Sequence, residues 1–191
     1  NQEIIGMDHM KMHVVKPSVN NLAARIFIRA AGLDIEEIDA YGQTRTAEYL
    51  ALCPAHLSPL LEADEVPKGA LWESCAIMQY LCNKNGLTQF YPDDPAQRAK
   101  QDSAMFYLVG TLYPVLARAT YPALQFPLYP GEVASSDTAS DADKEAAQKA
   151  PQDALAEPLD VFYGFFMDGQ KFIGGSAPPI ADMRFAATLE F

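Results

Sequence analysis

The sequence is poor in cysteine and has no paired-cysteine motif. Its 191 residues include only Cys53, Cys75 and Cys82, with no C-x-x-C spacing. An odd and small number of cysteines argues against a disulfide-stabilised scaffold, and it suits the cytoplasm or an organelle with a reducing interior. The three histidines have no metal-ligand spacing relative to these cysteines, so we expect no metal site.

Basic residues and long apolar runs are also scarce. The chain has 14 Lys and Arg against 25 Asp and Glu, and its formal net charge of −11 disfavours nucleic acid as a partner. No apolar run reaches the roughly 18 residues of a membrane span, and no signal or transit peptide is recognisable. Because 49% of the residues are hydrophobic, the chain can still bury a substantial core, in one domain or two small ones.

The first half of the chain alternates short strands and helices. Apolar periodicity and turn residues predict strands over 12–15, 35–39, 60–61 and 70–72. Helices are predicted over 22–31 and 43–52, and a third one begins at Ser74. A βαβ unit followed by a hairpin and a helix is typical of an α/β sandwich on a small mixed sheet.

The second half is predicted to be helical. Residues 86–95 are rich in Pro and Asp and predict a linker, and a helical pattern follows over 97–118, where Pro114 predicts a kink or break. We expect an ordered connector over 120–131 and a mobile surface segment over 133–149, which has no apolar period. Further helices are predicted over 152–167 and 180–189.

Glu73 and Ser74 stand at the start of one predicted helix. Serine is a favourable N-cap, and apolar residues recur behind it at Ile77 and Leu81. A helix N-terminus favours a carboxylate, while Glu73 can pair with an ammonium group. An α-amino acid end would suit this pair, although a capped helix with a solvated Glu explains the same residues.

Four motifs follow one another along the chain: Pro54-x-His56-x-x-Pro59-x-Leu61, Trp72-Glu73-Ser74-x-Ala76-Ile77-x-x-Tyr80-Leu81, Phe172-Ile173-Gly174-Gly175 and Ile180-Ala181-Asp182-x-Arg184-x-Ala186-Ala187. In this order they resemble the glutathione S-transferase family of the cytosolic type, with delta- or theta-like motifs in the first half. The resemblance extends from Met12 to Phe191.

The resemblance implies an α/β thioredoxin-like N-terminal domain followed by an all-α glutathione-transferase C-terminal domain. It places the glutathione-binding domain over 11–86, a linker over 87–96 and the helical domain over 97–191. Family members usually continue with further helices, so we expect the helical domain to be incomplete in this chain.

The resemblance also implies glutathione as co-substrate, without a metal. The main chain of Ser58, before a typically cis Pro59, would pair with the cysteinyl amide of glutathione. Glu73 and Ser74 would hold the γ-glutamyl end. His56 would lie near the glycyl carboxylate, or it is a loop histidine without a ligand. The predicted glutathione-binding residues are His56, Leu57, Ser58, Pro59, Glu73 and Ser74.

The group that would activate the glutathione thiol is not obvious. The family usually places a Tyr, Ser or Cys after the first strand, but no Tyr or Cys lies between Met12 and Arg25. Counting back from Arg25 places the serine position on Asn20 or Asn21, and Ser18 is another hydroxyl nearby. Ser18 and Asn21 are therefore the candidate catalytic residues, while a plain turn serine is the alternative for Ser18.

Two functions follow from the resemblance. The first is an enzyme that transfers the glutathione thiol to an electrophilic small molecule or reduces peroxides, with Tyr107, Thr111 and Arg118 as candidate acceptor-site residues. The second is a non-catalytic transferase-like scaffold or accessory subunit of a larger protein assembly. The expected partners are glutathione and either a second copy of the chain or such an assembly, with no nucleic acid and no membrane span.

Overall fold

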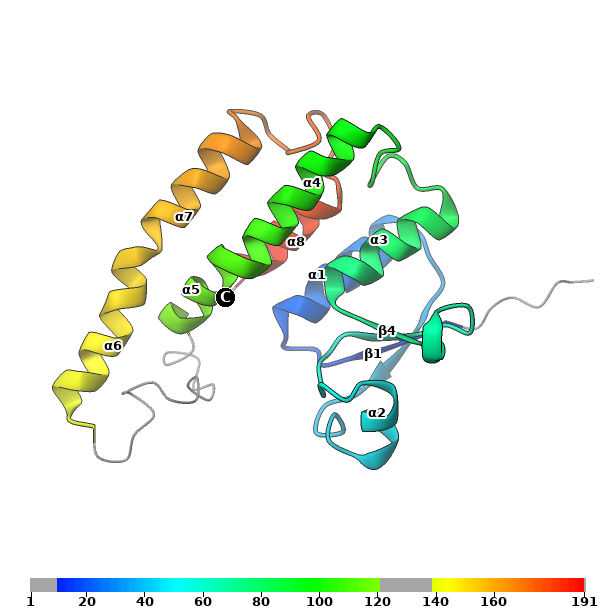
Figure 1. Ribbon diagram of the computed structural model, residues 1–191, viewed down its shortest axis with the longest axis horizontal. Helices are drawn as coiled ribbons and strands as arrows, with labels where there is room; N and C mark the ends of the chain where they lie inside the picture. Colours follow the sequence, from blue (N-terminus) through cyan, green and yellow to red (C-terminus); the bar gives the residue numbers. More distant parts are fainter. Residues whose placement is uncertain (1–9, 121–138, 191) are drawn as a thin grey trace, which may run out of the picture. The chain divides into compact units, whose positions relative to one another are not determined.

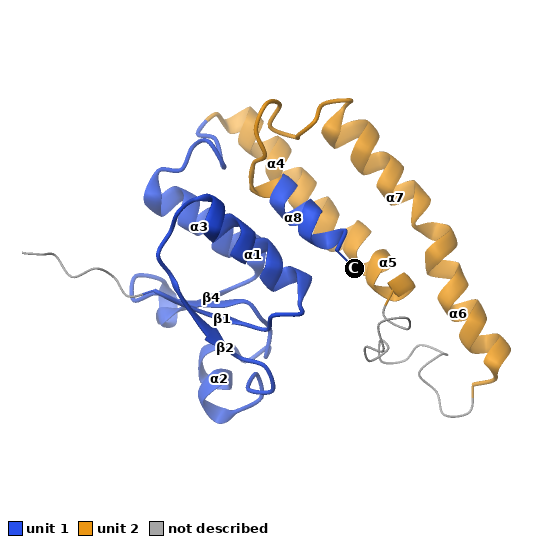
Figure 2. Ribbon diagram, turned by 180° about the vertical axis from the view of Figure 1, so that it is seen from behind, with its two compact units in different colours: residues 1–93, 182–190 blue, residues 94–181, 191 orange. Residues whose placement is uncertain are grey.

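The computed structural model describes residues 10–120 and 139–190. The chain divides into two compact units, coloured separately in Figure 2. Of the described residues, the first unit comprises 10–93 and 182–190, and the second comprises 94–120 and 139–181. The border after residue 93 falls inside the predicted linker. The grouping of residues 182–190 with the first unit was not expected from the sequence.

The first unit is built on a four-stranded mixed sheet. The strands are β1 (Lys11–Val14), β2 (Glu36–Asp39), β3 (Leu60–Glu62) and β4 (Ala70–Trp72), in the order β2-β1-β3-β4. Strand β1 pairs in parallel with β2 and antiparallel with β3, which pairs antiparallel with β4. All four predicted strands are confirmed, and their order is that of a thioredoxin-like sheet.

Helices cover both faces of this sheet (Figure 1). On one face α1 (Val19–Ala30) packs beside α3 (Ser74–Asn85), and α2 (Ala47–Leu52) lies on the other. Helix α1 begins three residues earlier than predicted. Helix α2 begins four residues later than predicted, because the Thr46 side chain accepts a hydrogen bond from the Tyr49 N–H and so caps the helix there.

Charged side chains fasten α1 to the edge strand β2. Arg25 and Arg29 share one face of the helix, and their guanidinium groups lie 2.9 and 3.5 Å from the same oxygen of Glu37. The hydrogen bond from Arg25 holds the pKa of the Glu37 carboxyl below its usual value.

The second unit consists of two helical runs. One run contains α4 (Pro95–Tyr107), η2 (Leu108–Leu112) and α5 (Tyr113–Thr120). The other contains α6 (Asp141–Ala154), α7 (Ala156–Val161) and η4 (Phe162–Met167), and the two runs contact each other through α5 and α6 and through α4 and η4. Helix α8 (Ile180–Thr188) begins with the last two residues of this unit, and its residues from 182 onward belong to the first unit. The helical character predicted for this half is confirmed.

The predicted break near Pro114 is confirmed. The helix widens into a π-helical turn over Leu108–Leu112 directly before the proline. Proline has no N–H to donate and its ring crowds the preceding turn, so the regular hydrogen-bond ladder cannot run through this point. The apolar stripe of Met105, Leu108, Leu112 and Leu116 is nevertheless buried along the whole run.

One prediction in this unit is wrong for the described part of its range. Residues 141–149 were expected to be mobile surface but form the first turns of α6. Ser140 caps the Asp143 N–H, and the Asp143 carboxylate accepts from the Ser140 N–H in return. This reciprocal cap starts a helix without an apolar period. The predicted connector over 120–131 lies, after its first residue, outside the described residues.

The packing of α1 predicts the effect of a core mutation. Phe27 is fully buried and meets Phe90 edge to face, with ring centroids 5.7 Å apart. We expect Phe27→Ala to lower the free energy of unfolding by about 3–5 kcal/mol, since it removes a large buried ring. Tyr41, which is 71% exposed in the same unit, supplies the control, and Tyr41→Ala should change it by less than about 0.5 kcal/mol. Urea denaturation measures both, and equal effects would contradict this packing.

Candidate active site

Three segments singled out in the sequence meet at one edge of the sheet. In the strand register, His13 near the end of β1 lies opposite Leu60 at the start of β3. Leu60 in turn lies opposite Trp72 at the end of β4. The turn after β1, the loop before β3 and the start of α3 therefore come together at this edge.

The loop before β3 presents an unpaired stretch of main chain. The Ser58–Pro59 peptide bond is cis, as the family resemblance predicted, and Pro59 is buried. Neither the N–H nor the C=O of Ser58 forms a hydrogen bond to another described residue. An extended ligand can therefore pair with both groups in the manner of an added strand.

The side chain of Asn21 fixes the position of this loop. Asn21 is 0% exposed, and its Oδ1 accepts a hydrogen bond from the N–H of Val15, just after β1, at 3.0 Å. Its Nδ2 donates to the Ser58 Oγ, also at 3.0 Å. The amide thus joins the end of the first strand, the first helix and the loop before β3.

Ser18 stands at the N-cap position of α1. Its backbone is extended, with φ −83° and ψ 127°, and its half-buried hydroxyl makes no capping bond and no other hydrogen bond to the described residues. The hydroxyl donor is therefore not used by any described residue. The neighbouring Asn20 differs, because its Oδ1 accepts a 2.5 Å bond from Nη2 of the buried Arg184.

The start of α3 departs from the prediction that Ser74 is the N-cap. Glu73 occupies the N-cap position, and Ser74 is the first helical residue and only 5% exposed. Glu73 has φ +80° and ψ 112°, a region that residues with a side chain rarely adopt. This places backbone strain at a candidate ligand position, while the exposed Glu73 carboxylate and the first N–H groups of the helix stay available.

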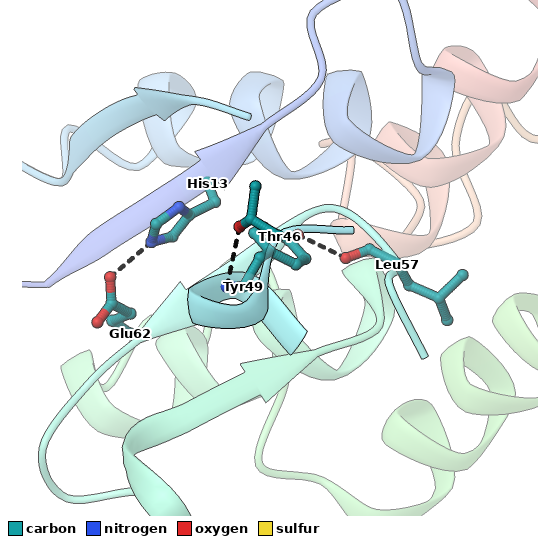
Figure 3. A network of polar contacts seen from close by, with 5 residues as sticks. All are labelled: His13, Thr46, Tyr49, Leu57 and Glu62. Atoms are coloured by element: carbon teal, nitrogen blue, oxygen red, sulfur yellow. Dashed lines mark hydrogen bonds and ion pairs between the residues drawn. The ribbon is translucent and has the colours of Figure 1, made fainter. Parts of the chain in front are cut away.

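His56 and Leu57 lie on the exposed part of the same loop. His56 adopts a left-handed backbone, with φ +48°, and Leu57 is 42% exposed. The Leu57 carbonyl accepts a 2.6 Å hydrogen bond from the hydroxyl of Tyr49 on α2 (Figure 3). This tie between α2 and the loop was not predicted, since residues of two different segments make it.

A polar pair lies behind Tyr49. His13 of β1 and Glu62 of β3 point to the α2 face, where the His13 Nε2 is 2.5 Å from a Glu62 oxygen (Figure 3). The imidazole ring meets the Tyr49 ring edge-on, with centroids 5.8 Å apart. The sequence signal for this pair is that His13 and Glu62 are polar residues at inward positions of their strands.

Comparisons with known proteins agree with this fold. The family model for the glutathione S-transferase N-terminal domain matches residues 10–83, which contain the whole sheet, α1, α2 and most of α3. The resemblance drawn from the motifs is confirmed.

Residues 10–83 belong to the glutathione S-transferase N-terminal domain family.

Several relatives match well beyond that domain. Glutathione S-transferase D7 of Drosophila melanogaster is 28% identical over 176 residues, which cover 87% of this chain and 67% of the relative. Glutathione transferase BmGSTD1 of Bombyx mori has a TM-score of 0.76 at 28% identity and covers 96% of this chain and 77% of its own. A delta-class glutathione transferase of Nilaparvata lugens reaches 0.73 at 26% identity, with 94% of this chain and 76% of its own covered.

The candidate acceptor-site residues all lie on the α4-to-α5 run. The hydroxyl of Tyr107 donates to the Pro158 carbonyl at 3.4 Å, and burial raises its pKa. Nη1 of Arg118 donates to the Pro114 carbonyl at 3.4 Å. Thr111 is exposed. Tyr107 and Arg118 thus have partners in their own helical unit.

Cys75 follows Ser74 directly in the first turn of α3. Burial raises the pKa of the Cys75 thiol, and the Arg184 guanidinium and a hydrogen bond with Ser74 oppose this rise only in part. The thiol therefore stays protonated near neutral pH. It does not place a competing thiolate beside the start of α3.

Over residues 10–120 and 139–190, no three His, Cys, Asp or Glu side chains lie close enough together to hold a metal ion. None of the helices in these ranges combines the length and apolar character needed to cross a membrane.

The burial of the thiols predicts slow thiol–disulfide exchange in the native protein. Cys53 and Cys82 are buried, and Cys75 has a raised pKa. At neutral pH we expect all three to react with a disulfide reagent at least about tenfold more slowly than in denaturant, because the thiolate is the reactive form. Mass spectrometry of the trapped adducts assigns each rate, and a fast native reaction at Cys75 would contradict the raised pKa.

Proposed function

We propose that this chain is an enzyme that binds glutathione at the sheet edge and transfers its thiol to an electrophilic small molecule. The observation that carries the proposal is the unpaired main chain of Ser58 beside the buried Pro59. A non-catalytic scaffold would have no need for a main-chain N–H and C=O that are left available to a ligand. The start of α3 at the same edge supports the same ligand.

Each part of glutathione has a partner of fitting chemistry. The cysteinyl amide and carbonyl pair with the C=O and N–H of Ser58, whose geometry the buried Pro59 helps to define. The γ-glutamyl carboxylate meets Ser74 and the N–H groups of α3, where the helix dipole favours an anion. The γ-glutamyl ammonium meets the Glu73 carboxylate. His56 and Leu57 lie at the exposed part of the loop and accommodate the glycyl end.

We assign the activation of the sulfur to Ser18. Its hydroxyl is half-buried at the start of α1 and has a free donor. A hydrogen bond to the thiolate favours that form and lowers the pKa of the bound thiol. The proton leaves to solvent, and the sulfur attacks the electrophilic carbon as the leaving group departs with its electron pair. Peroxide reduction would begin from the same thiolate.

Asn21 takes a positioning role in this proposal. Its side chain is 0% exposed and already binds Val15 and Ser58, so it does not reach a ligand sulfur. The assignment to Ser18 removes one ground for the non-catalytic scaffold, namely the lack of an obvious activating hydroxyl at Asn20 or Asn21. A homodimer and a reducing compartment remain predictions from the sequence.

The ligand site is tested by removing its two γ-glutamyl partners. We expect Glu73→Ala and Ser74→Ala each to weaken glutathione binding about tenfold or more in calorimetry, since each removes a charge-assisted contact. Glu36, an exposed carboxylate on β2, is the matched control, and Glu36→Ala should bind as wild type. Wild-type protein that shows no binding would overturn the proposed function.

The activator is tested separately by kinetics. We expect Ser18→Ala to lower kcat for a generic aryl halide by about 10²-fold while glutathione affinity stays within about threefold, because only the thiolate loses its donor. Ser103→Ala, which removes an exposed hydroxyl on α4, is the control. Equal turnover by wild type and the Ser18 variant would show that another group activates the thiol.

A further inference from the structure

The two polar groups of the peptide unit between Leu57 and Ser58 differ in their hydrogen bonding. Its carbonyl, from Leu57, receives the Tyr49 hydroxyl at 2.6 Å. Its N–H, from Ser58, is one of the two unpaired groups offered to a ligand. In a trans peptide the C=O and N–H lie in one plane and point in opposite directions. A donor that fixes the carbonyl on one side therefore also fixes the direction of the N–H on the other.

Tyr49 is itself held firmly in place. Its side chain is 4% exposed and packs in a small core with Ala40, Cys53 and Leu60. Its N–H donates to the Thr46 Oγ1 at 3.3 Å.

The far side of the Tyr49 ring is also supported. The ring rests edge-on against His13, which in turn is bonded to Glu62 (Figure 3). The hydroxyl thus projects from a rigid support toward the loop.

The hydroxyl of Tyr49 acts as a donor throughout the working pH range. Burial raises its pKa to about 12, so it stays protonated, and a main-chain carbonyl can only accept. Donation to a carbonyl also polarises the amide and makes its N–H a better donor.

We propose that Tyr49 is a positioning residue for glutathione. Its hydroxyl fixes the orientation of the Leu57–Ser58 peptide plane, to which the cysteinyl part of glutathione hydrogen-bonds. The inference rests on the proposed glutathione function. Tyr49 touches no part of the ligand and acts through the loop. Its counterpart on the other side of the loop is Asn21, which holds the Ser58 Oγ.

The first arm of the test needs no ligand. Tyr49→Phe keeps the ring and removes only the hydroxyl, so the packing is preserved. We expect the Ser58 amide resonance of the unliganded full chain to shift in the ¹⁵N–¹H NMR spectrum, while the thermal midpoint stays close to wild type. Tyr41→Phe, with a 71% exposed ring, should leave that resonance unchanged. An unshifted Ser58 amide in the Tyr49 variant would overturn the proposal, even if wild type proved not to bind glutathione.

The second arm measures the consequence for glutathione. The loss of one ordering hydrogen bond should raise KM for glutathione in Tyr49→Phe about two- to tenfold. The kcat should stay within about twofold, since Ser18 is untouched. A fall in kcat with unchanged KM would overturn the positioning role. Failure of the wild type to bind glutathione would instead refute the proposed function, and the first arm would still decide whether Tyr49 sets the peptide plane.

Discussion

The buried amide of Asn21 is the interaction on which the candidate site depends. Its oxygen satisfies the Val15 N–H at the end of the first strand, and its nitrogen holds Ser58 in the loop before β3. A side chain with no exposed surface cannot exchange these partners for water at low cost. Through this one group the turn that carries Ser18 and the loop that carries Ser58 keep a fixed relation to each other.

Neighbouring residues hold Ser58 in place from several directions, while its own N–H and C=O make no hydrogen bond to another described residue. Asn21 holds its Oγ, Tyr49 holds the carbonyl before it, and the buried Pro59 follows it. The strained backbone of Glu73 belongs to the same edge, next to the strand that pairs with β3. The first unit thus places its unusual backbone features where a ligand is proposed, and it supports them with buried side chains.

Local patterns predicted what depends on neighbouring residues. Apolar patterns and turn residues located the four strands, the Pro114 break was expected from ring geometry, and the ordered motifs led to the family and the fold. Patterns did not reveal partners that lie far apart in the chain. The bond between Asn20 and Arg184, for example, joins the first helix to the last. Caps were also misjudged, because a serine in front of an apolar period fits the N-cap and the first helical position equally well, and only the φ of Glu73 separates the two.

The central claim is that Ser18, positioned by the Asn21 bridge, stabilises the thiolate of bound glutathione. The most direct measurement is a pH titration of the ultraviolet absorbance of the thiolate in the binary complex, for wild type and for Ser18→Ala. In the wild type we expect the thiol pKa of bound glutathione to lie clearly below that of free glutathione. In the Ser18→Ala variant this pKa should return toward the free value. The same lowered pKa in both proteins would contradict it.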